Sequence, residues 1–176
     1  MVGVSRVVQM TLVATLGFAG LAMADEQMTP LAVSGNWVAL AHQPSMIGPA
    51  DVCLVAEATG GVALRASGGG IQLRIVNEKW SLPANVKGDI AMSVGNWKTT
   101  FEIDDNTNDM INAEVPPEIV DPMFAAMDKA ASMSLAVGNA KPLLVSLSGS
   151  TRATNAFRTC AGLKGNVTSP GSNPFQ

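Results

Sequence analysis

His42 is the only histidine in this 176-residue sequence, so a catalytic system that needs an imidazole base has to use it. A Ser-His-Asp system also needs a nucleophilic serine, and no Ser stands in a Gly-x-Ser-x-Gly elbow. We interpret Ser148-Gly149-Ser150 as a turn and a helix cap. A lone histidine without a partner motif is most simply a surface or turn residue, here beside Pro44. Zinc needs several N or S ligands, and a single His does not provide them if a disulfide uses both Cys.

Carboxylates could support a second kind of chemistry. A glycosidase needs two of them about 5–10 Å apart across a cleft. Candidate acids occur in one stretch of the chain: Glu102, Asp104, Glu114 and Glu118. Their spacing in the sequence does not place them in space, so a carboxylate-based hydrolase stays an alternative.

Residues 104–109 (DDNTND) resemble a calcium-binding loop in composition. In the EF-hand register counted from Asp104, Asp109 stands where Gly is required and Val115 where Glu is required. An EF-hand is therefore excluded; a polar hairpin tip is the preferred interpretation and a weak, irregular calcium site the alternative. The run Gly68-Gly69-Gly70 lacks the Lys-Ser/Thr of a phosphate loop and is interpreted as a turn. We expect no metal and no cofactor.

The first 24 residues have the three parts of a secretory signal. Arg6 provides the positive part, residues 7–21 are mostly apolar, and Ala22-Met23-Ala24 is a small-x-small cleavage site. The apolar run is shorter than the about 20 residues that span a bilayer, and Asp25 follows at once. We expect cleavage after Ala24 and a periplasmic or secreted product without a transmembrane anchor; a retained anchor is the alternative.

Cleavage leaves 152 residues, the length of one domain. We place this domain at residues 25–163 and a flexible tail, rich in Gly, Ser, Pro and Asn, at 164–176. Arg6 is the only charged side chain removed, so 10 basic and 14 acidic residues remain. This mildly acidic balance argues against a nucleic-acid partner, because phosphates require clustered Lys and Arg.

Cys53 and Cys160 are the only cysteines. In an oxidising compartment they most simply form a disulfide, with two free buried thiols as the alternative. The bond would close most of the chain into a loop, which is worth about 4–5 kcal/mol in the chain-entropy model. It would also hold the last predicted helix on the sheet that contains Cys53.

Alternation of apolar and polar residues predicts strands along most of the chain. The clearest case is Ile71, Leu73 and Ile75, which we expect to point inward, while Gln72 and Arg74 face solvent. The predicted strands are residues 37–40, 51–58, 62–66, 71–76, 90–94, 97–103, 110–115, 135–137 and 143–147. Residues 25–34 are predicted to be a lead-in with little structure. Gly-Asn-Trp occurs at 35–37 and 95–97, which we interpret as two strands that each begin after a turn.

Two helices are predicted late in the chain. Asp121 can cap the first, with Pro122 at its first helical position. Ser150 can cap the second, whose apolar face is made of Ala153, Ala156, Phe157 and Cys160. The expected fold is α+β: an antiparallel β-sheet or sandwich packed by the two late helices.

The strand at 143–147, the Gly149-Ser150 step and the short helix ending in Cys160 resemble the C-terminal end of small secreted proteins of alphaproteobacteria. The invasion-associated locus B group is the best-named of these. Trp37 followed by Cys53 is loosely similar to that group's opening. The resemblance covers about the last third of the chain, and this sequence has fewer cysteines than the group usually carries. It implies export, a β-rich fold and a disulfide, and it implies no active site because the group has no catalytic motif.

Taken together, these features favour a non-enzymatic periplasmic or secreted protein that binds another protein. The alternatives are a carboxylate-based hydrolase and a small-molecule carrier. A pocket with two acids of raised pKa would favour the hydrolase. A large apolar cavity between sheet and helices would favour the carrier, and an exposed apolar patch or bare sheet edge would favour the protein binder.

Overall fold

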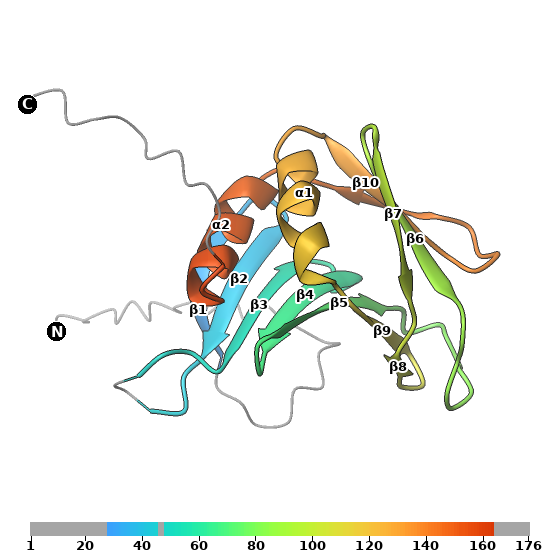
Figure 1. The fold of residues 1–176 in the computed structure, drawn as a ribbon, viewed down its shortest axis with the longest axis horizontal. Helices are drawn as coiled ribbons and strands as arrows, with labels where there is room; N and C mark the ends of the chain where they lie inside the picture. Colours follow the sequence, from blue (N-terminus) through green and yellow to red (C-terminus); the bar gives the residue numbers. More distant parts are fainter. Residues whose placement is uncertain (1–27, 46–47, 164–176) are drawn as a thin grey trace, which may run out of the picture.

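The structure is a computed structural model that describes residues 28–45 and 48–163. The predicted signal peptide at 1–24 and the predicted tail at 164–176 lie outside the described residues. The described chain forms eleven strands in two antiparallel sheets, together with two helices (Figure 1). The expectation of a β-rich chain with antiparallel sheets and two late helices is therefore confirmed. Within the described ranges, no helix is long and apolar enough to cross a membrane.

The larger sheet has seven strands, and every neighbouring pair in it is antiparallel. In their order across the sheet, they are β1 (Met28–Ser34), β2 (Trp37–His42), β3 (Val52–Glu57), β4 (Val62–Ser67), β5 (Gly70–Val76), β9 (Met110–Glu114) and β8 (Asp105–Asn106). The smaller sheet has four strands in the order β11 (Leu143–Ser146), β10 (Ser132–Val137), β6 (Asp89–Val94) and β7 (Trp97–Glu102). Strands β1 and β11 are thus edge strands of different sheets.

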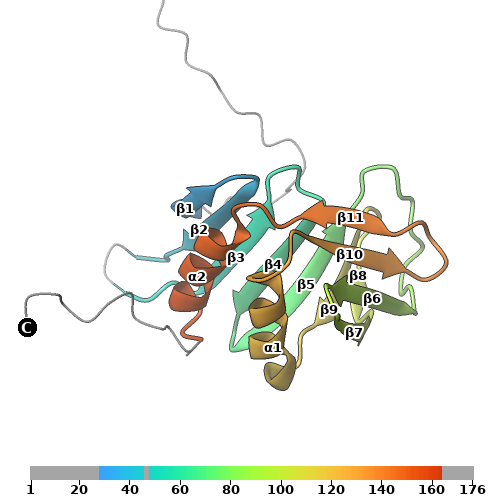
Figure 2. The same ribbon diagram turned by 90° about the horizontal axis from the view of Figure 1, so that it is seen from above.

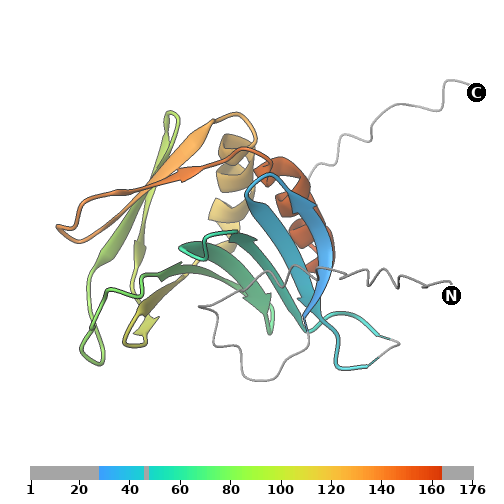
Figure 3. The ribbon, with the colours of Figure 1, turned by 180° about the vertical axis from the view of Figure 1, so that it is seen from behind.

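Helices α1 (Pro117–Met127) and α2 (Ser150–Cys160) lie on the same side of the larger sheet as the smaller sheet (Figures 1 and 3). Helix α2 contacts β1, β2 and β3, while α1 contacts α2 and β6. Seen from above, α1 lies between α2 and the smaller sheet (Figure 2). One continuous apolar core joins all four parts, and it includes Leu73 of β5, Met92 of β6, Phe124 of α1 and Phe157 of α2. The rings of the two phenylalanines are 6.1 Å apart between centroids.

The alternation in β5 is confirmed on its buried side. Ile71, Leu73 and Ile75 are buried in the core. Gln72 and Arg74 lie on the opposite face, as expected, but both are partly buried instead of open to solvent. The Arg74 guanidinium donates to Gln72 Oε1 at 3.3 Å. Partial burial is the main cause that lowers the pKa of Arg74, and the positive charge of Arg65 lowers it further.

Both Gly-Asn pairs are two-residue hairpin turns. Ser34 pairs with Trp37 across the first turn and Val94 with Trp97 across the second. Gly35 and Gly95 have φ values of 56° and 57°, a region that an L side chain rarely adopts and that turns of this length require. The interpretation of the repeat as two strands that each begin after a turn is confirmed.

The first of these turns packs directly against the start of α2. A Cβ on Gly35 would collide with the backbone carbonyl of Ser148, and a Cβ on Gly149 would collide with the backbone carbonyl of Ser34. Gly149, at φ 84°, is the residue before α2, and no side chain caps that helix. The predicted Ser150 cap is wrong. Ser150 is the first residue of the helix, and its buried hydroxyl has no hydrogen-bond partner within the described chain.

The predicted start of α1 is also wrong. The helix begins at Pro117, five residues before Pro122, and the residue that precedes it is Pro116. Pro117 suits the first helical position because its N–H is not needed there and its φ is already helical. Pro122 consequently lies inside the helix, where the missing N–H leaves the carbonyl of Glu118 without its usual helical donor. Asp121 is a helical residue and caps nothing.

A strand occupies the segment predicted to be an unstructured lead-in. Strand β1 pairs with β2 from Met28, opposite His42, to Ser34, opposite Trp37. Its alternation is hidden by Pro30 and by a register shift between Pro30 and Ala32, which leaves Leu31 without a direct partner. Such irregularities are tolerated at the edge of a sheet, where one side of the strand has no neighbour.

Candidate functional site

The predicted disulfide between Cys53 and Cys160 is present. It joins the middle of the larger sheet to the last residue of α2, with 6.0 Å between the two Cα atoms. Helix α2 packs on the sheet with the side chains of Ala153 and Phe157, which are fully buried. The predicted docking of this helix on the strand that contains Cys53 is therefore confirmed. No free cysteine occurs in the described chain.

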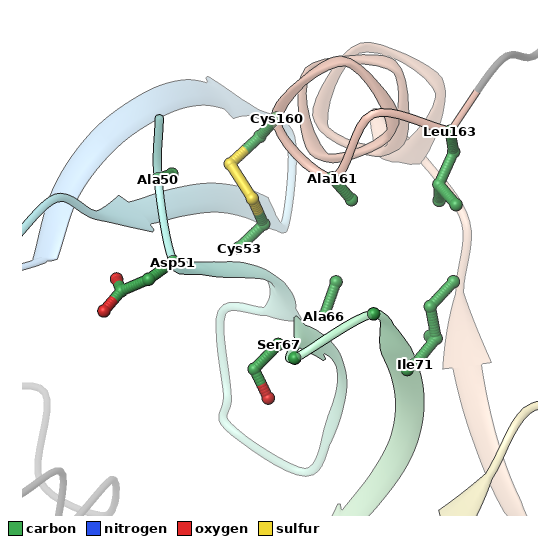
Figure 4. A pocket seen from close by; sticks show the side chains of 12 residues that line it. Ala50, Asp51, Cys53, Ala66, Ser67, Ile71, Cys160, Ala161 and Leu163 are labelled. Carbon is green, nitrogen blue, oxygen red and sulfur yellow. A yellow bond between two sulfur atoms is a disulfide. The ribbon is translucent and has the colours of Figure 1, made fainter. Parts of the chain in front are cut away.

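A cavity of about 280 Å³ lies beside the disulfide (Figure 4). Both cysteines line it, together with Ala66, Ile71 and Leu163. Figure 4 shows that the carboxylate of Asp51 at its edge points away from the cavity. This position between sheet and helix is the one that the carrier alternative requires. The volume, however, is below the about 300–1,000 Å³ of typical ligand sites.

His42 lies at the end of β2 opposite Val52, not in a turn beside Pro44. Its Nδ1 is 2.7 Å from an oxygen of Asp51. This hydrogen bond is the main cause that lowers the pKa of the exposed Asp51 carboxyl. Sequence reasoning missed the pair because nine residues separate its members along the chain and only the pairing of β2 with β3 brings them together.

Two of the four candidate acids line the same depression. Asp104 and Glu114 line a shallow depression of about 160 Å³, which Arg65 and Gln72 also line. Strand pairing explains the grouping, because Arg65 lies opposite Gln72 and Gln72 lies opposite Glu114. The other two acids do not line it: Glu102 ends β7, and Glu118 is in the first turn of α1.

The polar loop at 104–109 has a structural role in addition to its turn. Asn106 Oδ1 accepts a hydrogen bond from the Val86 N–H at 2.9 Å, and Asn106 Nδ2 donates to the Pro83 carbonyl at 2.9 Å. The Thr107 hydroxyl donates to Asp109 Oδ1 at 3.0 Å. The loop thus holds the segment between β5 and β6. No group of three or more His, Cys, Asp or Glu within the described ranges could hold a metal ion.

Large exposed apolar side chains are concentrated on two edge strands. In the described chain they are Leu31 and Val33 of β1 and Leu143 and Leu144 of β11, and Leu144 is the most exposed at 73%. A strand at 143–147, which carries the second pair, is predicted from the sequence, but nothing local shows that it lies at an edge. This property depends on β10 pairing with β6, which is distant in the sequence.

No model of a known protein family matches this chain, and no curated protein matches it. One solved structure is similar: the invasion associated protein B of Bartonella henselae, with 17% sequence identity and a TM-score of 0.47. The similarity covers 73% of this chain and 94% of that one. It is a weak structural likeness to the group that the C-terminal residues resemble, and membership of that group is not shown at the level of sequence.

Proposed function

We propose that this chain is a non-enzymatic protein of the periplasm or the extracellular space that acts by binding another protein. The observation that carries the proposal is the placement of Leu31, Val33, Leu143 and Leu144 on two sheet edges. An edge strand offers unpaired backbone groups, and large apolar side chains beside them favour contact with a partner.

The proposed compartment is supported by the signal-like residues 1–24 and by the disulfide, which persists in oxidising surroundings. We expect the mature protein to begin at Asp25, and mass spectrometry of the exported product measures this directly. An intact Met1 on a membrane-bound form would contradict it. We also propose that residues 25–163 are one sandwich-like domain packed by the two helices, supported by the core that the sheets and helices share.

Site-specific photo-crosslinking in the native compartment tests protein contact. A photoreactive residue replaces Leu144 or Val33 in turn, and the matched controls replace Thr100 of β7 and Glu78 of the β5–β6 loop. All four positions are exposed, and the controls lie on neither apolar edge. We expect one discrete adduct from an edge position and none from the controls. The same adducts from edge and control positions, or none from either edge, would refute the proposal.

A second candidate, a carboxylate-based hydrolase, is favoured by one observation: Asp104 and Glu114 line the same depression. Its small volume argues against a sizeable substrate. If the pair were catalytic, Asp104→Asn or Glu114→Gln would abolish hydrolysis of a chromogenic glycoside panel, whereas Glu102→Gln would not. We expect no turnover in the parent protein.

A further inference from the structure

The hydrogen-bond pattern of β11 shows which of its backbone groups face outward. Leu147 N–H donates to the Ala131 carbonyl at 2.9 Å, and the register pairs Ser146 with Ser132. Hydrogen-bonded and non-hydrogen-bonded pairs alternate along an antiparallel ladder. Leu144 and Ser146 are therefore in non-hydrogen-bonded pairs, and their N–H and C=O groups point away from β10.

Both ends of this outward edge are limited. Pro142, just before the strand, has no N–H to donate. At the other end, the Ser146 carbonyl accepts a hydrogen bond from Trp37 Nε1 at 2.8 Å. Three groups remain: the N–H and C=O of Leu144 and the N–H of Ser146. Among the residues that the structure describes, none accepts from or donates to these three groups.

The other apolar edge is less suited to pairing. Strand β1 contains Pro30, has a register shift, and is contacted by α2. Proline and bulges are devices by which natural sheets block the addition of a strand. Leu143–Ser146 has neither feature and carries no charge.

We propose that β11 binds an extended peptide segment of another protein as an additional antiparallel strand; this inference rests on the proposed function above. Backbone hydrogen bonds to Leu144 and Ser146 provide the docking, and an apolar side chain of the partner lies beside Leu144. The centre of the segment is uncharged, because Leu144 and its cross-strand neighbour Ser134 offer no counter-charge. Exposed Lys141 favours an acidic residue on the C-terminal side of that segment.

The test uses the oxidised mature protein and peptides selected on it from a random-peptide display library. We expect the enriched peptides to share a short uncharged run of apolar or β-branched residues followed by an acid. Amide hydrogen exchange of Leu144 and Ser146 should slow on binding. Protection confined to other amides would overturn the proposal.

Leu144→Pro removes one outward N–H and leaves the bonds to β10 intact. We expect it to weaken peptide binding about 10-fold or more, the equivalent of one lost interaction of about 1.4 kcal/mol. The matched control Leu144→Thr keeps the N–H and should lose less. Urea unfolding verifies that each variant is folded. If Leu144→Pro does not fold, Ser146→Pro is used in its place, because it removes the other outward N–H. Equal binding by the parent and the proline variant would refute strand addition.

Two further outcomes separate this inference from its alternatives. A concentration-dependent dimer in analytical ultracentrifugation that Leu144→Pro abolishes would assign the edge to a second copy of this chain and overturn the peptide partner. If a protein crosslinked from the Leu144 position still binds the proline variant, this result supports the protein-binding function and refutes strand addition at β11.

Discussion

The close approach of the β1–β2 turn to the start of α2 leads to a quantitative prediction. Gly35 and Gly95 occupy equivalent positions in two Gly-Asn turns and have almost the same φ, 56° and 57°. Alanine at either site costs about 1–2 kcal/mol for the left-handed backbone. At Gly95 a Cβ meets no atom within 4 Å, whereas at Gly35 it collides with the backbone of Ser148. Overpacking of this kind adds about 1–3 kcal/mol.

We therefore expect Gly35→Ala to lower the free energy of unfolding by about 2–5 kcal/mol and Gly95→Ala by about 1–2 kcal/mol. The pair is matched in residue type, turn type and φ, so the difference reports the contact with α2 alone. Urea unfolding of the oxidised protein measures both values, provided that the m-values agree. Equal destabilisation by the two variants would show that the turn and the helix are not in contact. A larger effect at Gly95 would refute the reasoning altogether.

Three further variants test the core, the loop and the disulfide. Leu73→Ala should cost about 2–5 kcal/mol in a denaturation experiment and Gln72→Ala much less; equal losses would mean that the register of β5 is wrong. Asn106→Ala should cost about 1–2 kcal/mol because it removes the hydrogen bonds to the Val86 N–H and the Pro83 carbonyl, while Asn108→Ala, whose side chain makes no hydrogen bond to another described residue, should cost little. Replacing both cysteines by alanine should cost about 2–5 kcal/mol, and thiol labelling of the unreduced, denatured parent should find no free thiol; labelling of two would contradict the bond.

Local patterns predicted most strands because many of them keep one face in the core, as β5 does, while β3 is an apolar run that is buried on both faces. They failed where a local rule was overridden. Strand β1 was missed because Pro30 and the bulge hide its alternation. Proline favours a helix start, which predicts one at Pro122, but Pro117 satisfies the same preference earlier in the chain. Serine is a common capping residue, which predicts a cap at Ser150, but contact with the β1–β2 turn requires glycine before the helix.

The candidate site was less predictable than the fold. The disulfide followed from the number of cysteines, because two cysteines allow one pairing. The shared depression of Asp104 and Glu114, and the edge position of Leu144, depend on which strands become neighbours. Strand order is set by packing over the whole domain, and no residue type near those positions reports it.

The position of the disulfide in the chain has a consequence for the order of assembly. The two cysteines are 107 residues apart, so in a chain exported amino terminus first, Cys53 crosses the membrane long before Cys160. The earlier thiol has no partner in its own chain until the last helix has also crossed, and exchange with other thiols can occupy it in the meantime. A chain that stops before α2 carries an unpaired thiol for its whole lifetime. Under the export that we propose, covalent closure thus occurs only in molecules whose last helix has crossed the membrane.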